Sequence, residues 1–197
     1  MKPKIILIGA GGHCTSCIDV IEQEFRFEIS GIIDINNEKK SLLNYPLFGN
    51  DEDLDALRSH YEFAFITIGQ IKTSANRIKL YKKLNSLKFI LPTIISPQAY
   101  VSKHATIGVG TIIMGGAFVN AKASIGDNCI INTKAIIEHD VKVESHSHIS
   151  TGSIVNGFSI IKEGTFIGSN SIVKQHAKTN LNDFIKAGTV FKGYQDE

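Results

Sequence analysis

The chain has 197 residues, of which 43% are hydrophobic and 20% are charged, and its formal net charge is +2. This composition is typical of a folded protein with a substantial core, and the charge is too small to indicate a nucleic acid or an anionic membrane surface as a partner. No apolar run approaches the roughly 18 residues of a membrane span, and the first residues lack the pattern of a secretory signal. We therefore expect a cytoplasmic protein without a membrane span or a nucleic-acid partner.

Residues 1–92 alternate apolar segments that suit strands with segments whose apolar residues recur at helical intervals. In chain order, we predict a strand and a glycine-rich turn over residues 4–12, a helix over 14–25, a strand over 27–34, a helix over 50–61, a strand over 63–69, a helix over 74–87 and a short strand over 88–91. This alternation predicts a parallel sheet, and hence a small Rossmann-like α/β domain over residues 1–92. Pro92 and Pro97 flank the join to a second domain over residues 93–197, because proline suits the start of a strand but not the continuation of a helix.

The glycine-rich turn indicates a phosphate-binding site. Gly11 and Gly12 follow a strand and precede a helix, so main-chain amides and the helix N-terminus can face a phosphate. His13 can donate to the same phosphate, and Asp34 ends the next strand, where a carboxylate can accept from ribose hydroxyls. Cys14 stands where a dinucleotide fingerprint has its last glycine, which leaves NAD binding as an alternative. A tight turn without a ligand is another.

Three cysteines give no disulfide framework, and we expect reduced thiols. Cys14 and Cys17 form a C-x-x-C pair at the start of the predicted helix, where small buried residues are common, although a redox pair remains an alternative. A zinc site would need a second ligand pair at matching spacing, so we predict no metal.

The second half repeats with a period of six. Every sixth residue is isoleucine or valine, and the residue four positions later is small or β-branched. The aliphatic positions are Ile95, Val101, Ile107, Ile113, Val119, Ile125, Ile131, Ile137, Val143, Ile149, Val155, Ile161, Ile167 and Val173, and the frame skips Thr179 and resumes at Ile185. Neither a helix nor an alternating strand has this period, which predicts a solenoid with one short strand and one corner in each hexad.

The hexads locate candidate catalytic residues. His139 is the third residue of its hexad and projects outward at a corner, and Gly157 occupies the same corner three hexads later. A histidine beside a main-chain amide without a side chain can supply both a base and an oxyanion donor, which indicates acyl transfer. Asp140 follows and can orient the imidazole. His148 lies half a coil from His139, so the two histidines can meet only between two chains.

Three other histidines share the fourth hexad position, and we interpret them as ordinary surface corner residues: His104, His146 and His176.

The hexad pattern resembles the hexapeptide-repeat acyltransferases, whose repeats wind into a left-handed parallel β-helix with three hexads per coil. The glycine loop with His13, the strand ending at Asp34 and the segment TIGQ…R from Thr67 to Arg77 resemble the sugar acyltransferases that include the bacillosamine-pathway acetyltransferases and the sialic acid O-acetyltransferase group. The resemblance spans nearly the whole chain. It implies acetyl-CoA as co-substrate and a homotrimer with active sites at the subunit interfaces.

The resemblance also implies residue roles. His139 matches the general base, Asp140 its orienting acid, His148 a contact to acetyl-CoA and Asn132 a polar active-site residue; some relatives carry Glu in place of Asp140. Gly157 matches the glycine whose backbone faces the thioester oxygen. The late segments over 166–173 and 186–193 would line the groove for pantetheine, and Lys186 and Lys192 could meet CoA phosphates. The implied cofactor contacts are His148, Asn132, Gly157, Gly168, Lys186 and Gly188, and the implied substrate contacts are Gly11, Gly12, His13, Asp34 and Gly69.

We therefore predict an acetyl-CoA-dependent acetyltransferase that acts on the 4-amino group of a nucleotide-linked, UDP-type 4-amino-4,6-dideoxy sugar. Acetylation of a hydroxyl on sialic acid or a related sugar is the nearest alternative. A non-catalytic sugar-nucleotide binding module and a passive repeat scaffold are further alternatives from another class of protein.

Overall fold

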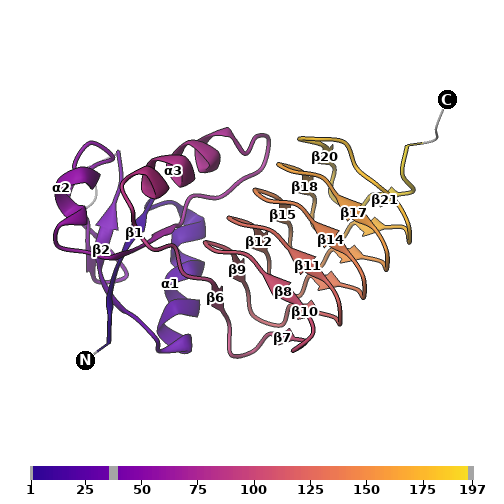
Figure 1. The fold of residues 1–197 in the computed structure, drawn as a ribbon, viewed down its shortest axis with the longest axis horizontal. Coiled ribbons are helices and arrows are strands. Elements are labelled where there is room, and N and C mark those ends of the chain that lie inside the picture. Colours follow the sequence, from indigo (N-terminus) through magenta and orange to yellow (C-terminus); the bar gives the residue numbers. More distant parts are fainter. Residues whose placement is uncertain (1, 36–39, 195–197) are drawn as a thin grey trace.

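The computed structural model describes residues 2–35 and 40–194. A small α/β unit packs against one side of a long β-solenoid, and the chain passes from the first to the second without returning (Figure 1). The predicted fold, an α/β domain followed by a solenoid, is confirmed. The boundary predicted between residues 92 and 93 falls between the last bridge of the α/β unit, at Ile90, and the first solenoid strand, which begins at Ile94.

The α/β unit contains a parallel sheet of three strands in the order β2-β1-β5. Its strands are β1 (Lys4–Ile8), β2 (Glu28–Ile33) and β5 (Phe63–Ile66), its helices are α1 (Gly12–Glu24), α2 (Leu54–Arg58) and α3 (Ala75–Ser86), and a small hairpin joins β3 (Ser41–Leu42) to β4 (Tyr45–Pro46). The order reverses at β1, so the carboxyl ends of β1 and β5 flank a topological switch point, where α/β sheets bind ligands.

Alternate residues of β1 build two cores, as the period of a strand requires. Ile5 and Leu7 pack with α1 on the face that meets the solenoid, and Ile6 and Ile8 pack with α2 and α3 on the other face. The layer around α1 also includes solenoid residues, so the two units share one core.

Three local predictions for the first domain differ from the structure. The expected strand over 88–91 is reduced to one bridge between Ile90 and Phe63, because the chain turns at Pro92 toward the solenoid. The helix expected over 50–61 contains only the five residues of α2. The hairpin of β3 and β4 lies in a segment where no strand was predicted.

Each solenoid strand has two residues, and successive strands stack in parallel on three faces. The first face contains β6 (Ile94–Ile95), β9 (Ile112–Ile113), β12 (Ile130–Ile131), β15 (His148–Ile149), β18 (Phe166–Ile167) and β20 (Phe184–Ile185). The second face contains β7 (Tyr100–Val101), β10 (Phe118–Val119), β13 (Ile136–Ile137), β16 (Ile154–Val155), β19 (Ile172–Val173) and β21 (Val190–Phe191). The third face contains β8 (Thr106–Ile107), β11 (Ser124–Ile125), β14 (Lys142–Val143) and β17 (Ile160–Ile161).

The second residue of each strand points inward, and these aliphatic side chains form the solenoid core together with the small residues of the hexads. Where the frame skips, Thr179 is 1% exposed, and its hydroxyl accepts a 2.8 Å hydrogen bond from the amide of Lys162. The buried Thr179 is therefore tolerated in the solenoid core, because its hydroxyl forms a hydrogen bond. The register predicted from the hexads is confirmed along the solenoid.

Candidate active site at the solenoid corners and the domain junction

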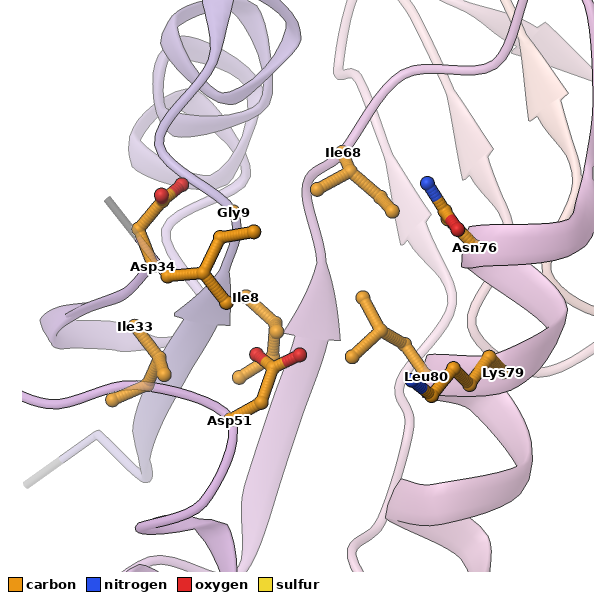
Figure 2. Close-up of a pocket in the computed structure, with 10 residues that line it drawn as sticks. Ile8, Gly9, Ile33, Asp34, Asp51, Ile68, Asn76, Lys79 and Leu80 are labelled. Atoms are coloured by element: carbon orange, nitrogen blue, oxygen red, sulfur yellow. The ribbon is translucent and has the colours of Figure 1, made fainter.

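A cavity of about 280 Å³ lies at the switch point of the α/β sheet. Asp34 and Asp51 line one side and α3 lines the other through Asn76, Lys79 and Leu80 (Figure 2). One carboxylate oxygen of Asp34 accepts a 2.5 Å hydrogen bond from the amide of Ala10, which ties the end of β2 to the glycine loop. The cavity combines apolar walls with carboxylates, a carboxamide and an ammonium group, a mixture that is common in small-molecule sites.

The glycine loop begins beside this cavity and ends at the start of α1. Gly9 has a φ of 107°, and a Cβ there would lie 2.2 Å from Cγ2 of Ile68, so the fold itself requires glycine at this position. Gly11 and Gly12 are exposed, and a Cβ at either would meet no atom within 4 Å. The N-terminus of α1 is therefore open to a ligand, since the first amides of a helix lack intrahelical acceptors.

His13 points toward the domain junction. Gly69 lies beside this histidine: a Cβ on Gly69 would lie 3.5 Å from Cβ of His13, which is an ordinary van der Waals distance. Burial lowers the pKa of His13 to about 3, with smaller contributions from Arg77 and His148. His13 is therefore neutral at physiological pH, and any hydrogen bond that it donates to a phosphate comes from a neutral imidazole. Nε2 of His13 is buried and has no hydrogen-bond partner among the described residues.

His148 and Asn132 lie together at the same junction, and their predicted contact with acetyl-CoA stays a prediction. Nε2 of His148 lies 3.1 Å from Nδ2 of Asn132, and Nδ1 lies 2.6 Å from the carbonyl oxygen of Gln70. Because a carbonyl only accepts, Nδ1 carries the proton and Nε2 accepts from Asn132. Burial lowers the pKa of His148 to about 4, so the ring is neutral at physiological pH. A hydrogen bond from this ring to a ligand therefore requires one of the two bonds to open.

Arg77 joins the two domains. The side chain is 1% exposed; Nη1 donates to the carbonyl oxygens of Ile66 and Ile68, and Nη2 donates to the carbonyl and side-chain oxygens of Asn128 in the solenoid. No carboxylate within the described part of the chain forms an ion pair with it. Burial lowers the pKa of Arg77 to about 10. This buried cation is close enough to His13 and His148 to lower the pKa of both rings.

The predicted base lies at a different corner, between β13 and β14. Nδ1 of His139 is 3.0 Å from Oδ2 of Asp140. The carboxylate can only accept, so Nδ1 carries the proton and Nε2 presents its lone pair. Nothing within residues 2–35 and 40–194 hydrogen bonds to Nε2, and His139 is exposed. This is the tautomer and the accessibility that a general base needs.

Gly157 lies against the His139 ring, as the hexad count predicts. A Cβ at Gly157 would lie 2.8 Å from Cε1 and 3.0 Å from Nε2 of His139, so a side chain there would displace the imidazole. Along the described backbone, the amide of Gly157 has no acceptor, while its carbonyl accepts from His176. This corner therefore combines a base, His139, with the neighbouring Gly157, whose amide has no acceptor along the described backbone.

The late corner residues have structural roles that require no ligand. A Cβ at Gly168 would lie 2.4 Å from the amide nitrogen of Ala187, so glycine lets successive coils approach. Gly188 has a φ of 68°, which favours glycine. Lys186 is exposed, and its carbonyl accepts from Ser171. Gly168, Lys186 and Gly188 lie at the same corner of the solenoid as Asn132. Their predicted contact with CoA stays a prediction.

Several residues at the site were missed or misread. His146 is not a surface histidine: it is 8% exposed, Nδ1 lies 3.0 Å from Nδ2 of Asn128, and the ring packs edge-on against Tyr81 of α3. A hexad position alone does not reveal which corner the first domain covers. Gln70 was likewise not singled out for its contact to His148, and Phe158, whose ring is 5.3 Å from that of His139, gave no signal in the repeat.

The three cysteines are buried free thiols, and burial raises the pKa of Cys14 to about 11. Low thiol reactivity is expected of such residues. Within the described residues, no group of three or more His, Cys, Asp or Glu side chains is placed to hold a metal ion, and no helix is long and apolar enough to cross a membrane.

Comparison with known proteins gives consistent matches. Residues 4–84 match the family model described as the PglD N-terminal domain. The structure is similar to the acetyltransferase domain of PglB from Neisseria gonorrhoeae in complex with acetyl coenzyme A, with a TM-score of 0.91 and 28% identity over 98% of this chain and 92% of that chain.

It is also similar to PerB from Caulobacter crescentus in complex with CoA and GDP-perosamine, with a TM-score of 0.69 and 27% identity over 96% of this chain and 94% of that chain. WeeI from Acinetobacter baumannii shares the fold, with a TM-score of 0.65 and 20% identity over 97% of each chain.

Proposed function

We propose that this chain is a hexapeptide-repeat sugar acyltransferase and that it transfers an acetyl group from acetyl-CoA to the 4-amino group of a nucleotide-linked 4-amino-4,6-dideoxy sugar. The observation that carries the proposal is the His139 corner. There an imidazole oriented by Asp140 presents Nε2 beside the unused amide of Gly157. General-base help and oxyanion stabilisation are the two contributions that acyl transfer from a thioester needs.

In the proposed reaction, the sugar amine attacks the thioester carbon and a C–N bond forms. Nε2 of His139 takes the proton from the amine, and Asp140 stabilises the resulting imidazolium. The amide of Gly157 donates to the oxygen of the tetrahedral intermediate. The C–S bond then breaks, and the imidazolium returns the proton to the leaving thiolate. The amine is itself a competent nucleophile, so no covalent enzyme intermediate is needed.

The nucleotide end of the acceptor fits the α/β unit. The cavity beside Asp34 has a size and polarity suited to a nucleoside, and the open N-terminus of α1 at Gly11 and Gly12 favours the diphosphate. The sugar would then extend from the glycine loop toward the junction of His13, Asn132 and His148. Solved relatives that hold acetyl coenzyme A or GDP-perosamine support the same pairing of substrates.

The outer surface of the second face supports assembly into a trimer with sites at the subunit interfaces. Its outward positions form an apolar ladder: Tyr100, Phe118, Ile136, Ile154, Ile172 and Val190. Tyr100, Phe118, Ile172 and Val190 are 54%, 37%, 39% and 59% exposed. The strands of this face lead directly into the His139 corner, so a second copy covering the ladder would bring its own surface to the base.

The test is CoA release from acetyl-CoA with a panel of acceptors: a UDP-linked 4-amino-4,6-dideoxyhexose, GDP-perosamine, free sialic acid and CMP-sialic acid. We expect release with an amino sugar nucleotide and a loss of turnover by ~10²–10⁴ in His139→Ala. Release only with the sialic acids would favour hydroxyl acetylation. Tight binding of a nucleotide sugar without thiol release in the unmodified protein would favour a binding module, and near-normal kcat in His139→Ala would refute the base assignment.

A further inference from the structure

The corner that contains His139 includes one residue whose type the solenoid does not require. The last turn residue at this corner adopts the left-handed backbone conformation in four coils: Lys122, Asp140, Phe158 and His176 have φ of 61°, 58°, 60° and 62°. Among the described solenoid residues with such a φ other than glycine, Phe158 is the only apolar one, and three corners elsewhere use asparagine. Asparagine tolerates this conformation, whereas a bulky side chain is strained in it.

Phe158 is also not held there by burial. Its side chain is 46% exposed, so the ring contributes little to the core. Phe158 is thus both strained and half-exposed, although asparagine adopts the same backbone conformation with less strain at other corners. Backbone strain of this kind is concentrated at functional sites, which points to a role for Phe158 outside folding.

The ring contacts explain that role. The Phe158 ring meets the His139 ring edge-on, with centroids 5.3 Å apart and an angle of 84° between the planes. The Phe158 ring also stacks on His176, with centroids 5.0 Å apart and planes 12° from parallel. His139 is thus contacted by Asp140 at Nδ1, by Gly157 and by Phe158, while Phe158 is held in turn by His176.

We propose that Phe158 is a positioning residue that holds the imidazole of His139 in its productive orientation, with His176 as its support. The inference rests on the proposed role of His139 as the base. It requires no direct contact between Phe158 and either substrate. An imidazole free to turn away from Gly157 would separate the base from the oxyanion donor, and small misplacements of reacting groups lower turnover steeply.

The test replaces Phe158 by the residue that relieves the strain. In Phe158→Asn we expect a Tm that is unchanged or raised by roughly 2–4 °C, because the left-handed conformation becomes easier. We also expect kcat to fall by about 10–100-fold with KM for acetyl-CoA and for the UDP-linked 4-amino-4,6-dideoxyhexose within about twofold of the unmodified protein. Phe158→Tyr keeps the ring and should keep kcat. Lys122→Asn is the matched control and should leave kcat unchanged, since it introduces the same residue at the same corner and φ, and the described structure shows no hydrogen bond between Lys122 and His139.

Two results would overturn the proposal. Full kcat in Phe158→Asn would show that the ring does not position the base. A lower Tm in Phe158→Asn, together with an equal loss of kcat in Phe158→Tyr, would show a structural role only. His139→Ala, measured in the same assays, separates this inference from the proposed function: if that variant is active, the base assignment fails, and if it is inactive while Phe158→Asn is active, only the positioning role fails.

Discussion

The carbonyl oxygen of Gln70, in the loop before α3, accepts a 2.6 Å hydrogen bond from Nδ1 of His148 on the solenoid. This contact fixes the tautomer of His148 and connects the two domains beside Asn132. Since both ring nitrogens have partners within the chain, protonation of the ring would break the hydrogen bond that Nε2 accepts. The junction is therefore sensitive to acid.

The first prediction is that acid destabilises the protein through this junction. The folded-state pKa values of His148 and His13, about 4 and about 3, lie below the ordinary value of 6.5. As the pH falls below 6.5, the unfolded chain binds protons that the folded chain does not, so the free energy of unfolding decreases. For His148 alone the loss by pH 4 is on the order of 3 kcal/mol.

Urea unfolding between pH 7 and pH 4 measures this loss. In His148→Gln, we expect the dependence of the unfolding free energy on pH to decrease by up to one proton, because the titrating group is gone. An unchanged dependence in this variant would mean that His148 does not titrate across the transition.

The second prediction concerns Arg77. Replacement by Met leaves the carbonyl of Ile68 and the side chain of Asn128 without their donor. Each buried acceptor left without its donor costs about 1–3 kcal/mol, so for these two acceptors we expect a loss of about 2–6 kcal/mol in the free energy of unfolding. Loss of the positive charge should also raise the pKa of His13 and His148, which NMR titration of the folded variant would detect.

Lys82→Ala is the control for Arg77→Met, because Lys82 is exposed on the same helix. Its change in stability should stay within about 0.5 kcal/mol. A loss of the same size in both variants would attribute the effect to α3 in general and not to the buried guanidinium.

The third prediction is that Gly157 is needed for its lack of a side chain. In Gly157→Ala the new Cβ would lie 2.8 Å from Cε1 of His139, so the imidazole must move away from Asp140 or from the oxyanion donor. We expect kcat to fall by about 10–100-fold with little change in Tm. Gly115→Ala is the control, since the equivalent position at another corner has its nearest contact at 3.4 Å, to a flexible glutamine side chain. Equal activity of both variants would argue against the stacked arrangement.

The hexad count predicted the solenoid and the position of Gly157 beside His139, because a fixed period determines which residues lie next to each other in successive coils. Each coil adds the same displacement, so a residue three hexads later must lie beside its predecessor. Local sequence patterns likewise predicted β1, α1 and β2, where apolar segments occur next to glycines.

The sequence could not predict how the two domains dock. His146 and Arg77 are buried only because α3 covers one corner of the solenoid, and that contact depends on residues distant in the chain. The cavity at the switch point shows the same limit: Asp34 was predicted as a binding residue, while Asp51, Asn76 and Lys79 reach the cavity from segments whose packing no local pattern specifies.

The last prediction concerns assembly. If a second copy covers the apolar ladder of the second face, a charge in the ladder should prevent it. Ile172 is 39% exposed on this face, so Ile172→Glu should leave the monomer folded while burying an unpaired carboxylate at any subunit interface.

We expect analytical ultracentrifugation to show trimers for the unmodified protein and monomers for Ile172→Glu. We also expect the monomer to lose activity, because in the proposed assembly each site takes residues from two chains. Ser124→Glu is the matched control, because Ser124 is exposed at the equivalent strand position of the polar third face. A trimeric, active Ile172→Glu protein would exclude this face as the interface, and a fully active monomer would show that one chain contains the complete site.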